Sequence, residues 1–271
     1  MCKTMGVSRS GFYDWQRRPL DTHEQEDQTL METIKTIHTQ SRGTYGTPRV
    51  QAELRDQGQR LSRARIGRFM RRAGLMVRCK RKTRSTTNSK HRYPVATNLL
   101  ERDFTATQPN QKWTTDITYL PTAEGWLYLA VVLDLFSRKV VGWAMRETLH
   151  SGLVISALEM AETRRSPTAN LLHHSDQGVQ YASLGYRQAL ERLEAVQSMS
   201  RKGECWDNAP TESFFATLKT ELELDKARGN RAQTRSLVFE WIEAFYNRER
   251  RHSSLGYLSP AQFEEQHSRL N

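Results

Sequence analysis

Hydrophobic residues recur with two different spacings along the chain, and the change of spacing divides it into two parts. Up to about residue 77, apolar side chains recur every three or four residues, as at Leu30, Ile34 and Ile37, which is the pattern of one helix face. From Lys112 onward they form strand-like runs, one of them apolar on both faces. The pattern predicts a small helical part followed by a part that mixes strands and helices.

The first part is predicted to contain several short helices. Residues 7–15 form one that Ser8 caps, and residues 21–40 form a longer, polar one. Thr47-Pro48 gives an N-cap with proline at the first position of a helix that runs to about residue 57. Ser62 caps the next helix, which ends near Gly74.

The last two of these helices resemble a helix-turn-helix, because they are short and flank a glycine-containing turn. The buried side of the second one comprises Ile66, Phe69, Met70 and Leu75. Its outer side comprises Arg63, Arg65, Arg68, Arg71 and Arg72. A DNA-reading helix fits this pattern, and a plain helical hairpin with a solvated basic face is the alternative that remains open.

Residues 78–92 are basic and polar and show no hydrophobic period, so we expect an extended tether that lies along phosphates when DNA is bound. The predicted division of the chain has four parts. They are the remnant of an N-terminal helix-turn-helix at 1–19, a helical DNA-binding domain at 20–77, a basic linker at 78–103 and an α/β domain with C-terminal helices at 104–271.

The order of elements in the second part is that of a ribonuclease-H-like fold. Three strands come first, expected as an antiparallel meander, and helix, strand, helix, strand and helix follow. The predicted ranges are 113–120, 126–134 and 139–145 for the meander, 151–160 and 184–193 for helices, 170–173 and 196–199 for strands, then a helix around Glu212, a long helix at 231–248 and a terminal helix capped by Ser259-Pro260. We therefore expect an α/β fold with a mixed five-stranded sheet and flanking helices.

The positive charge of the chain is concentrated in one segment. The whole chain carries +11 with an isoelectric point near 9.8. Residues 41–92 alone hold 16 Lys or Arg against the acids Glu53 and Asp56, so the rest of the chain carries −3. This distribution is typical of a nucleic-acid-binding module joined to a near-neutral body, with a merely solvated basic surface as the alternative.

Cysteine usage and hydropathy indicate a cytosolic protein. Cys2, Cys79 and Cys205 are far apart and lack CxxC spacing, which favours a reducing compartment over a disulfide framework or a zinc finger. No apolar run approaches the ~18 residues of a membrane span. The first residues lack the apolar core of a signal peptide.

Three carboxylates stand in three different settings. Asp116 lies within an otherwise apolar or β-branched strand, Asp176 just past a strand end, and Glu212 in the first turns of a helix. A sheet and a packed helix can bring such positions together. Two Mg²⁺ ions about 4 Å apart, each needing few protein oxygens, can clamp the attacking and leaving oxygens of a phosphoryl displacement. The three acids are therefore candidate metal ligands and catalytic residues.

Each acid also has an ordinary interpretation. Asp176 in Ser-Asp-Gln-Gly suits a turn, and Glu212 suits a solvated or dipole-stabilising helix position. Asp134, Glu204 and Asp207 are competing acids, of which Asp134 suits the turn after its strand. Spacing alone, with 59 residues between the first two candidates and 35 between the last two, leaves both interpretations open.

The helix around Glu212 places a lysine near the same side. Its apolar stripe comprises Phe214, Phe215, Leu218 and Leu222. Lys219 follows Glu212 by seven residues, about 20° around the helix, so both lie at the margin of that stripe. Glu212 can thus face a half-buried cleft with Lys219 positioned for a phosphate.

Taken together, the motifs resemble a known family. They are Trp113-Thr-Thr-Asp116-Ile-Thr-Tyr119, Asp134-Leu-Phe-Ser-Arg138, His174-Ser-Asp176-Gln-Gly178, Asp207-Asn-Ala-Pro-Thr-Glu212-Ser-Phe-Phe, and Tyr246-Asn-Arg-Glu-Arg-Arg-His252-Ser-Ser-Leu-Gly-Tyr257 with Ser259-Pro260. They are similar to insertion-sequence transposases of the retroviral-integrase-like superfamily, in particular to second-reading-frame products of elements with two overlapping frames. The resemblance extends from about residue 37 to the end.

This resemblance implies a chemistry and a set of partners. Asp116, Asp176 and Glu212 match the catalytic triad, and Lys219 matches a basic position that contacts the transposon end. The implied cofactor is two Mg²⁺ ions, or Mn²⁺, on a ribonuclease-H-like fold. The implied substrates are double-stranded terminal inverted repeats and target DNA, bound by a homo-oligomer. Water cuts at a 3′ end, and the 3′-hydroxyl then attacks a target phosphodiester without a covalent enzyme intermediate.

The residues expected to contact DNA are basic and lie in four places. They are Lys219 beside the acids, Arg63, Arg65, Arg68, Arg71 and Arg72 on the predicted helix, Lys80, Arg81 and Lys82 in the tether, and Arg201, Lys202, Arg248 and Arg251 in the second part.

One departure from the family concerns partners. The active family product is usually a fusion whose first-frame part carries a helix-turn-helix and a coiled coil, of which this chain has at most the tail and no heptad run. A first-reading-frame protein is therefore a candidate partner.

Two other functions remain open. A nuclease of the same fold that only hydrolyses would cut DNA without joining it. A DNA-binding regulator with a non-catalytic integrase-like domain would bind DNA whether or not Asp116 is intact, and would not cleave it with Mg²⁺ or Mn²⁺.

Overall fold

The computed structural model describes residues 2, 4–17, 22–77, 93–201, 205–224 and 229–269. Its chain folds into two compact units, Met1–Val77 and Arg78–Asn271. Several predicted residues lie outside the described part, namely Lys80, Arg81, Lys82, Lys202 and Glu204. No helix of the described part is both long and apolar enough to cross a membrane.

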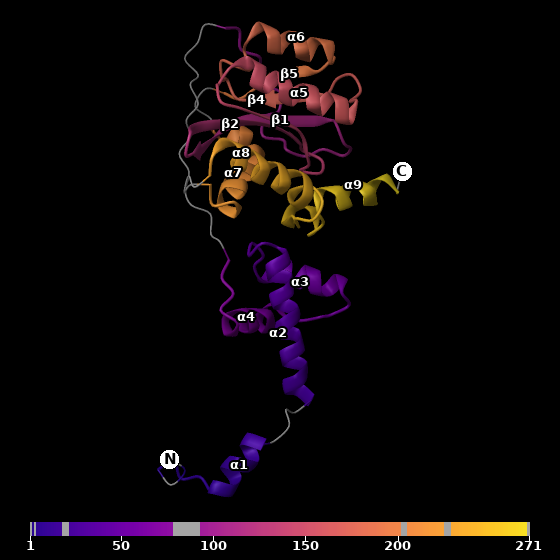
Figure 1. Cartoon of the computed structure of the whole chain (residues 1–271). Helices are drawn as coiled ribbons and strands as arrows, with labels where there is room; N and C mark the ends of the chain where they lie inside the picture. The colour runs from indigo at the N-terminus through magenta and orange to yellow at the C-terminus, as the bar shows by residue number, and fades with distance from the viewer. Residues whose placement is uncertain are drawn as a thin grey trace. The chain divides into compact units, whose positions relative to one another are not determined.

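The first unit is helical, as its apolar spacing predicts (Figure 1). Its elements are α1 Arg9–Arg17, α2 Thr22–Gln40, α3 Thr47–Asp56 and α4 Arg63–Arg72. The side chains buried between α2, α3 and α4 are Ile34, Ile37, Val50, Leu54, Ile66, Phe69 and Met70. The last two helices are therefore joined to α2 by an apolar core and are not an isolated hairpin.

The helix caps follow the sequence with one exception. Ser62 caps α4 by accepting a hydrogen bond from the backbone N–H of Arg65 at 3.2 Å. At α3 the capping position is Gly46 in extended backbone, and Thr47 is already the first helical residue. The proline then lies within the first turn, where its missing N–H costs nothing.

The arginines of α4 divide into two groups. Arg65 pairs with Asp27 at 2.7 Å, and Arg63 Nε donates to Gln51 Oε1 at 3.1 Å, so both are held by their own unit. Arg68, Arg71 and Arg72 are exposed. Arg63 is exposed as well, so among the predicted DNA contacts on this helix only Arg65 is partly buried.

A mixed five-stranded sheet forms the centre of the second unit, with strand order β3-β2-β1-β4-β5 (Figure 1). The strands are β1 Lys112–Thr122, β2 Gly125–Asp134, β3 Val140–Arg146, β4 Leu172–Ser175 and β5 Val196–Met199. The first three form the predicted antiparallel meander, while β4 runs parallel to β1 and β5 parallel to β4. The predicted α/β fold class is confirmed.

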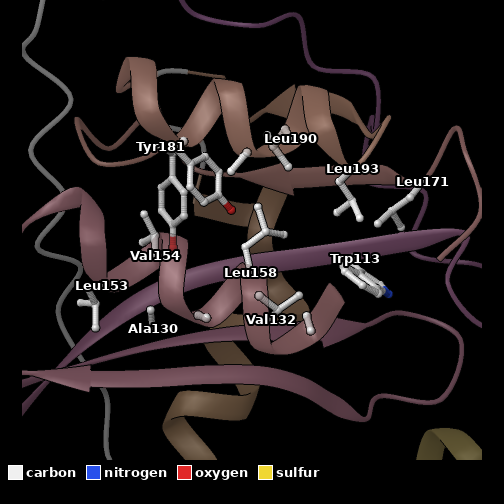
Figure 2. Close-up of a cluster of buried hydrophobic side chains, with 14 of the residues drawn as sticks. Trp113, Ala130, Val132, Leu153, Val154, Leu158, Leu171, Tyr181, Leu190 and Leu193 are labelled. Carbon is white, nitrogen blue, oxygen red and sulfur yellow. The ribbon is translucent and has the colours of Figure 1, made fainter. Parts of the chain in front are cut away.

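Two helices, α5 Ser151–Arg165 and α6 Leu184–Arg192, cover one face of this sheet. Figure 2 shows the apolar cluster between them and the strands, with Trp113, Val132, Leu158 and Tyr181 at its centre. Trp113 comes from β1, so residues two and four further along that strand point to the same side. Thr114 and Asp116 therefore point to the opposite side.

The opposite face carries α7 Ala209–Glu221 and α8 Arg231–Glu240 (Figure 1). A 3₁₀ turn, Cys205–Asn208, leads into α7. After α8 come a π-helix at Trp241–Tyr246, a 3₁₀ turn at Ser253–Leu255 and α9 Pro260–Ser268, which Ser259 caps as predicted.

The predicted helix at 231–248 is present through Tyr246, but its second half is a π-helix and not an α-helix. Trp241 and Tyr246 are five residues apart, which an α-helix would place about 140° apart around its axis. The wider turn brings both rings against Phe214 of α7, at centroid distances of 5.7 and 4.9 Å. The π-helix thus depends on packing against a residue that is distant in the chain, and the local sequence does not predict it.

Residues 93–103, the described part of the predicted linker, pack on the second unit. Leu100 is buried, and the backbone N–H groups of Leu99 and Leu100 donate to Ser198 Oγ at 2.9 and 3.3 Å. Asp134, at the end of β2, accepts hydrogen bonds from the backbone N–H groups of Phe136 and Asn110, which agrees with its predicted role at the turn.

Gly142→Ala tests the packing of β3 on α5. A Cβ at residue 142 would lie 2.7 Å from Ala161 N and closer still to the carbonyl oxygen of Ala157, both backbone atoms of α5. We expect the free energy of unfolding to fall by roughly 3 kcal/mol, measured by urea unfolding. Gly152→Ala, whose added Cβ meets only one atom near 3.9 Å, is the matched control. Equal stability of the two variants would contradict this packing.

Candidate active site

Asp116 lies in the middle of β1 and faces the α7 side of the sheet. Its neighbour Thr114 marks that side, because Thr114 Oγ1 lies 2.8 Å from Thr211 Oγ1 of α7. Asp116 is half-buried, and its Oδ1 accepts a hydrogen bond from the backbone N–H of Ile117 at 2.7 Å. The central strand thus carries a carboxylate at the boundary between the sheet and the helix.

Asp176 follows β4 directly, beside the same stretch of β1. The parallel register pairs Thr114 with His174, and continuing it by two residues sets Asp176 opposite Asp116. Asp176 Oδ1 also accepts from the backbone N–H of Gly178 at 2.9 Å, so the residue closes a turn as well. Its two interpretations, turn and site, are therefore compatible.

Glu212 lies in the first turn of α7 and is exposed. The residue before it, Thr211, is fully buried against β1. The apolar stripe of α7 agrees with the prediction at Phe214, Phe215 and Leu218. These contacts turn the start of the helix toward Asp116.

The charges of Asp176 and Glu212 affect the ionisation of the Asp116 carboxyl. Burial raises the pKa of the Asp116 carboxyl well above its ordinary value, and the negative charges of Asp176 and Glu212 raise it further. The Ile117 N–H and the positive charge of Lys219 act in the opposite direction. Burial likewise raises the pKa of Glu212. Asp176, Glu212 and Lys219 therefore all lie within electrostatic range of Asp116.

The arrangement is not a closed metal cage. Within the part of the chain that the structure describes, no three His, Cys, Asp or Glu side chains lie close enough together to surround one ion. Hard cations such as Mg²⁺ usually keep several waters and take one or two carboxylates, so an open arrangement is still compatible with them.

The two histidines beside Asp176 are interior residues. His174 Nδ1 lies 2.8 Å from Ser198 Oγ, and His173 Nε2 lies 3.3 Å from the Tyr186 hydroxyl. Burial lowers the pKa of His173 to about 3 and that of His174 to about 4, so both rings are neutral at physiological pH. They are buried, neutral side chains of β4 and are therefore not candidate acid–base groups.

Asp207 is a structural residue whose role the sequence does not show. Its carboxylate, 1% exposed, accepts from Arg102 Nε at 2.7 Å, from Asn98 Nδ2 at 2.9 Å and from the Arg201 backbone N–H at 3.0 Å. Burial alone would raise the pKa of Asp207, but these donors hold it below its ordinary value. Asp207 thus ties the 98–102 segment to the start of α7.

The predicted basic contacts of the second unit differ in exposure. Arg201 and Arg248 are exposed. Arg251 is buried, and its Nη1 donates to the Tyr257 carbonyl at 2.9 Å. Its prediction as a DNA contact is therefore corrected, because its guanidinium belongs to the interior of the C-terminal region.

Comparison with known families agrees with both units. Models of an integrase core domain match residues 106–205 and 194–260, and a model of an HTH-like domain matches residues 24–83. The transposase InsF of insertion sequence IS3A from Escherichia coli K12 is 46% identical over 266 residues, which is 97% of this chain and 92% of that protein. The chain belongs to the insertion-sequence transposases.

One further relative matches this transposase along its sequence, and one solved structure shares its fold. An uncharacterized 31 kDa protein of insertion element IS600 from Shigella sonnei is 46% identical over 270 residues, covering 100% of this chain and 99% of that protein. A chain of the simian T-cell lymphotropic virus intasome shares the fold, with a TM-score of 0.51 and 18% identity over 85% of this chain and 74% of that one. The expected class, a DNA transposase of polynucleotidyl-transferase type, is confirmed, and its HTH-like domain makes DNA a partner.

Asp207→Asn tests the connection to the 98–102 segment. We expect the free energy of unfolding at pH 7 to fall by about 2 kcal/mol, because Arg102, Asn98 and the Arg201 N–H lose a charged acceptor that is itself buried. Since the folded pKa of Asp207 is depressed, its contribution is complete above the unfolded pKa, near 4, and disappears as the pH falls through the folded value.

Urea unfolding at pH 7 and at pH values below 4 measures this difference. Glu191→Gln is the control, because Glu191 is an exposed acid on α6. A stability loss at pH 7 no larger than that of the control would contradict the proposed role of Asp207.

Proposed function

We propose that Asp116, Asp176 and Glu212 of this transposase hold two Mg²⁺ ions, or Mn²⁺, and cut and join the 3′ ends of its element. The observation that supports this most directly is the mutual effect of their charges. Three carboxylates from β1, the end of β4 and the start of α7 are near enough that two of them raise the pKa of the third. Burying an acid between two others is costly unless a cation meets it.

The donor set fits hydrated divalent cations better than a soft or tightly enclosed metal. All three side chains offer carboxylate oxygens, which Mg²⁺ and Mn²⁺ prefer. The exposed position of Glu212 leaves room for water and for a phosphate. When bound, such ions would supply Lewis-acid stabilisation of the attacking and leaving oxygens.

The main contribution of the protein's own residues is then to hold the reacting groups in place. Asp116 is fixed by the strand ladder, and Asp176 by its turn to Gly178. Glu212 approaches from the helix, and Lys219, two turns further along, brings a positive charge near Asp116. We infer that this lysine receives a phosphate of the terminal repeat.

The first unit is proposed to hold DNA through exposed arginines of α4, which include Arg68, Arg71 and Arg72. Neutralised phosphates release counterions, so binding would weaken steeply with salt.

Two DNA ends and a target must be bound together. We therefore propose a homo-oligomer on DNA, with a first-reading-frame protein as candidate partner and the bacterial cytoplasm as the place of action.

The triad can be tested by a joining assay with a labelled DNA end and a target. We expect Asp116→Asn, Asp176→Asn and Glu212→Gln each to lower cleavage and joining by more than about 100-fold, because each removes a charge from the site. The protein should remain folded by circular dichroism. Glu191→Gln on α6, an exposed acid on the other face of the sheet, is the matched control.

The products of this assay separate the alternatives. Cut DNA without joined product from the wild type would support a hydrolysis-only nuclease. DNA binding without any cleavage, unchanged in Asp116→Asn, would support a DNA-binding regulator. Full activity of a triad variant would remove that acid from the proposed site.

Lys219→Ala tests the phosphate contact. We expect binding of end DNA to weaken by about 10-fold at low salt, measured by fluorescence anisotropy, while Mn²⁺ binding measured by calorimetry stays near the wild-type value. Arg192→Ala, an exposed cation on α6, is the control. Equal losses in both variants would show a general charge effect and not a contact at Lys219.

A further inference from the structure

The first turn of α7 is attached to β1 by two polar side chains that adjoin the acids. Asn208 Nδ2 donates to the backbone carbonyl of Thr115 at 3.0 Å, and Thr115 directly precedes Asp116. Thr211 Oγ1 lies 2.8 Å from Thr114 Oγ1. Because Thr211 directly precedes Glu212, both attachments are one or two residues from a proposed metal ligand.

The two attachments also support each other. Thr211 Oγ1 lies 3.1 Å from Asn208 Oδ1, which orients the amide so that its nitrogen faces the strand. Thr114 and Thr211 are fully buried and Asn208 is 4% exposed. Buried polar groups of this kind are satisfied by their partners, and losing one partner leaves the other costly.

Apolar packing alone would position this helix less sharply. Phe214, Phe215 and Leu218 hold α7 on the sheet through contacts that depend on area and not on direction. Hydrogen bonds, in contrast, are restricted in length and angle. The hydrogen bonds between α7 and β1 lie at the end of the helix that carries Glu212. They therefore fix the position of Glu212 along the direction of β1.

We propose that Asn208 and Thr211 are positioning residues that set the separation of Glu212 from Asp116 on which DNA joining depends. This inference rests on the proposed function of the three acids. It concerns rate more than binding, because neither residue is expected to touch DNA. A displacement of about 1 Å at a reacting centre can lower a rate by about 100-fold.

Thr211→Val removes the hydroxyl at nearly unchanged volume. We expect kcat for joining to fall by about 10- to 100-fold, while KM for end DNA changes by less than about threefold. Thr211→Ser keeps the hydroxyl and should restore most of the rate. Thr217→Val is the matched control, since that buried hydroxyl donates to the Ser213 carbonyl of its own helix at 2.8 Å.

A double-mutant cycle with Thr114→Val tests the pair from the strand side. If the contact between the two hydroxyls is the cause, Thr114→Val loses a similar rate and the double variant is no slower than either single one. Losses that multiply in the double variant, or a Thr211→Ser variant as slow as Thr211→Val, would overturn the inference. Thr211→Ala, with the same expected loss, replaces Thr211→Val if that variant does not fold.

Glu212→Gln is measured in parallel to keep the two proposals apart. If Glu212→Gln joins DNA at the wild-type rate, the proposed function fails. If Glu212→Gln is inactive while Thr211→Val and Thr114→Val join like wild type, the positioning role alone is wrong.

Discussion

Electrostatic repulsion between three carboxylates on a rigid frame is the constraint around which the second unit is built. Asp116 is held in the ladder of β1 with β2, opposite Val131, and β4 pairs with β1 up to Thr114, two residues before Asp116. The mutual repulsion has to be offset by protons or by cations. Other buried acids of this unit have arginine partners: Glu221 accepts from Arg250 at 2.7 to 3.0 Å, and Asp207 from Arg102. Asp116 instead experiences the negative charges of Asp176 and Glu212, which would favour added cations.

The same helix shows how one residue type can serve structure and chemistry at once. Glu221 at the end of α7 is buried and joins that helix to the π-helix through Arg250 and Trp241 Nε1. Glu212 at its start is exposed, and its charge acts on Asp116. The helix is thus anchored at its far end by an ion pair and at its near end by Asn208 and Thr211. Two anchors along one axis leave α7 little freedom to slide on β1.

Sequence reasoning succeeded where the determining interactions are local. Alternation and apolar runs identify the strands, Ser62 and Ser259 identify helix starts, and Asp116 stands out against its strand. It was less successful where partners are distant in the chain. Asp207 depends on Asn98 and Arg102, more than 100 residues earlier, and the π-helix depends on Phe214. The burial of Arg251 likewise follows from the fold of the C-terminal region and has no signal in a basic motif.

What separates a transposase from a nuclease of the same fold is which hydroxyl reaches the phosphorus. Hydrolysis and strand transfer are both in-line displacements, so the three carboxylates, in the role proposed for them, would serve a water molecule or a DNA 3′-hydroxyl equally well. On this proposal the difference comes from groups that would place DNA, such as Lys219, whose charge acts on Asp116, and exposed arginines of α4. The proposed role of Thr211 concerns the position of Glu212, and the proposed role of the basic side chains concerns the position of DNA. If both proposals hold, the catalytic geometry and the choice of nucleophile depend on different residues and can be altered separately.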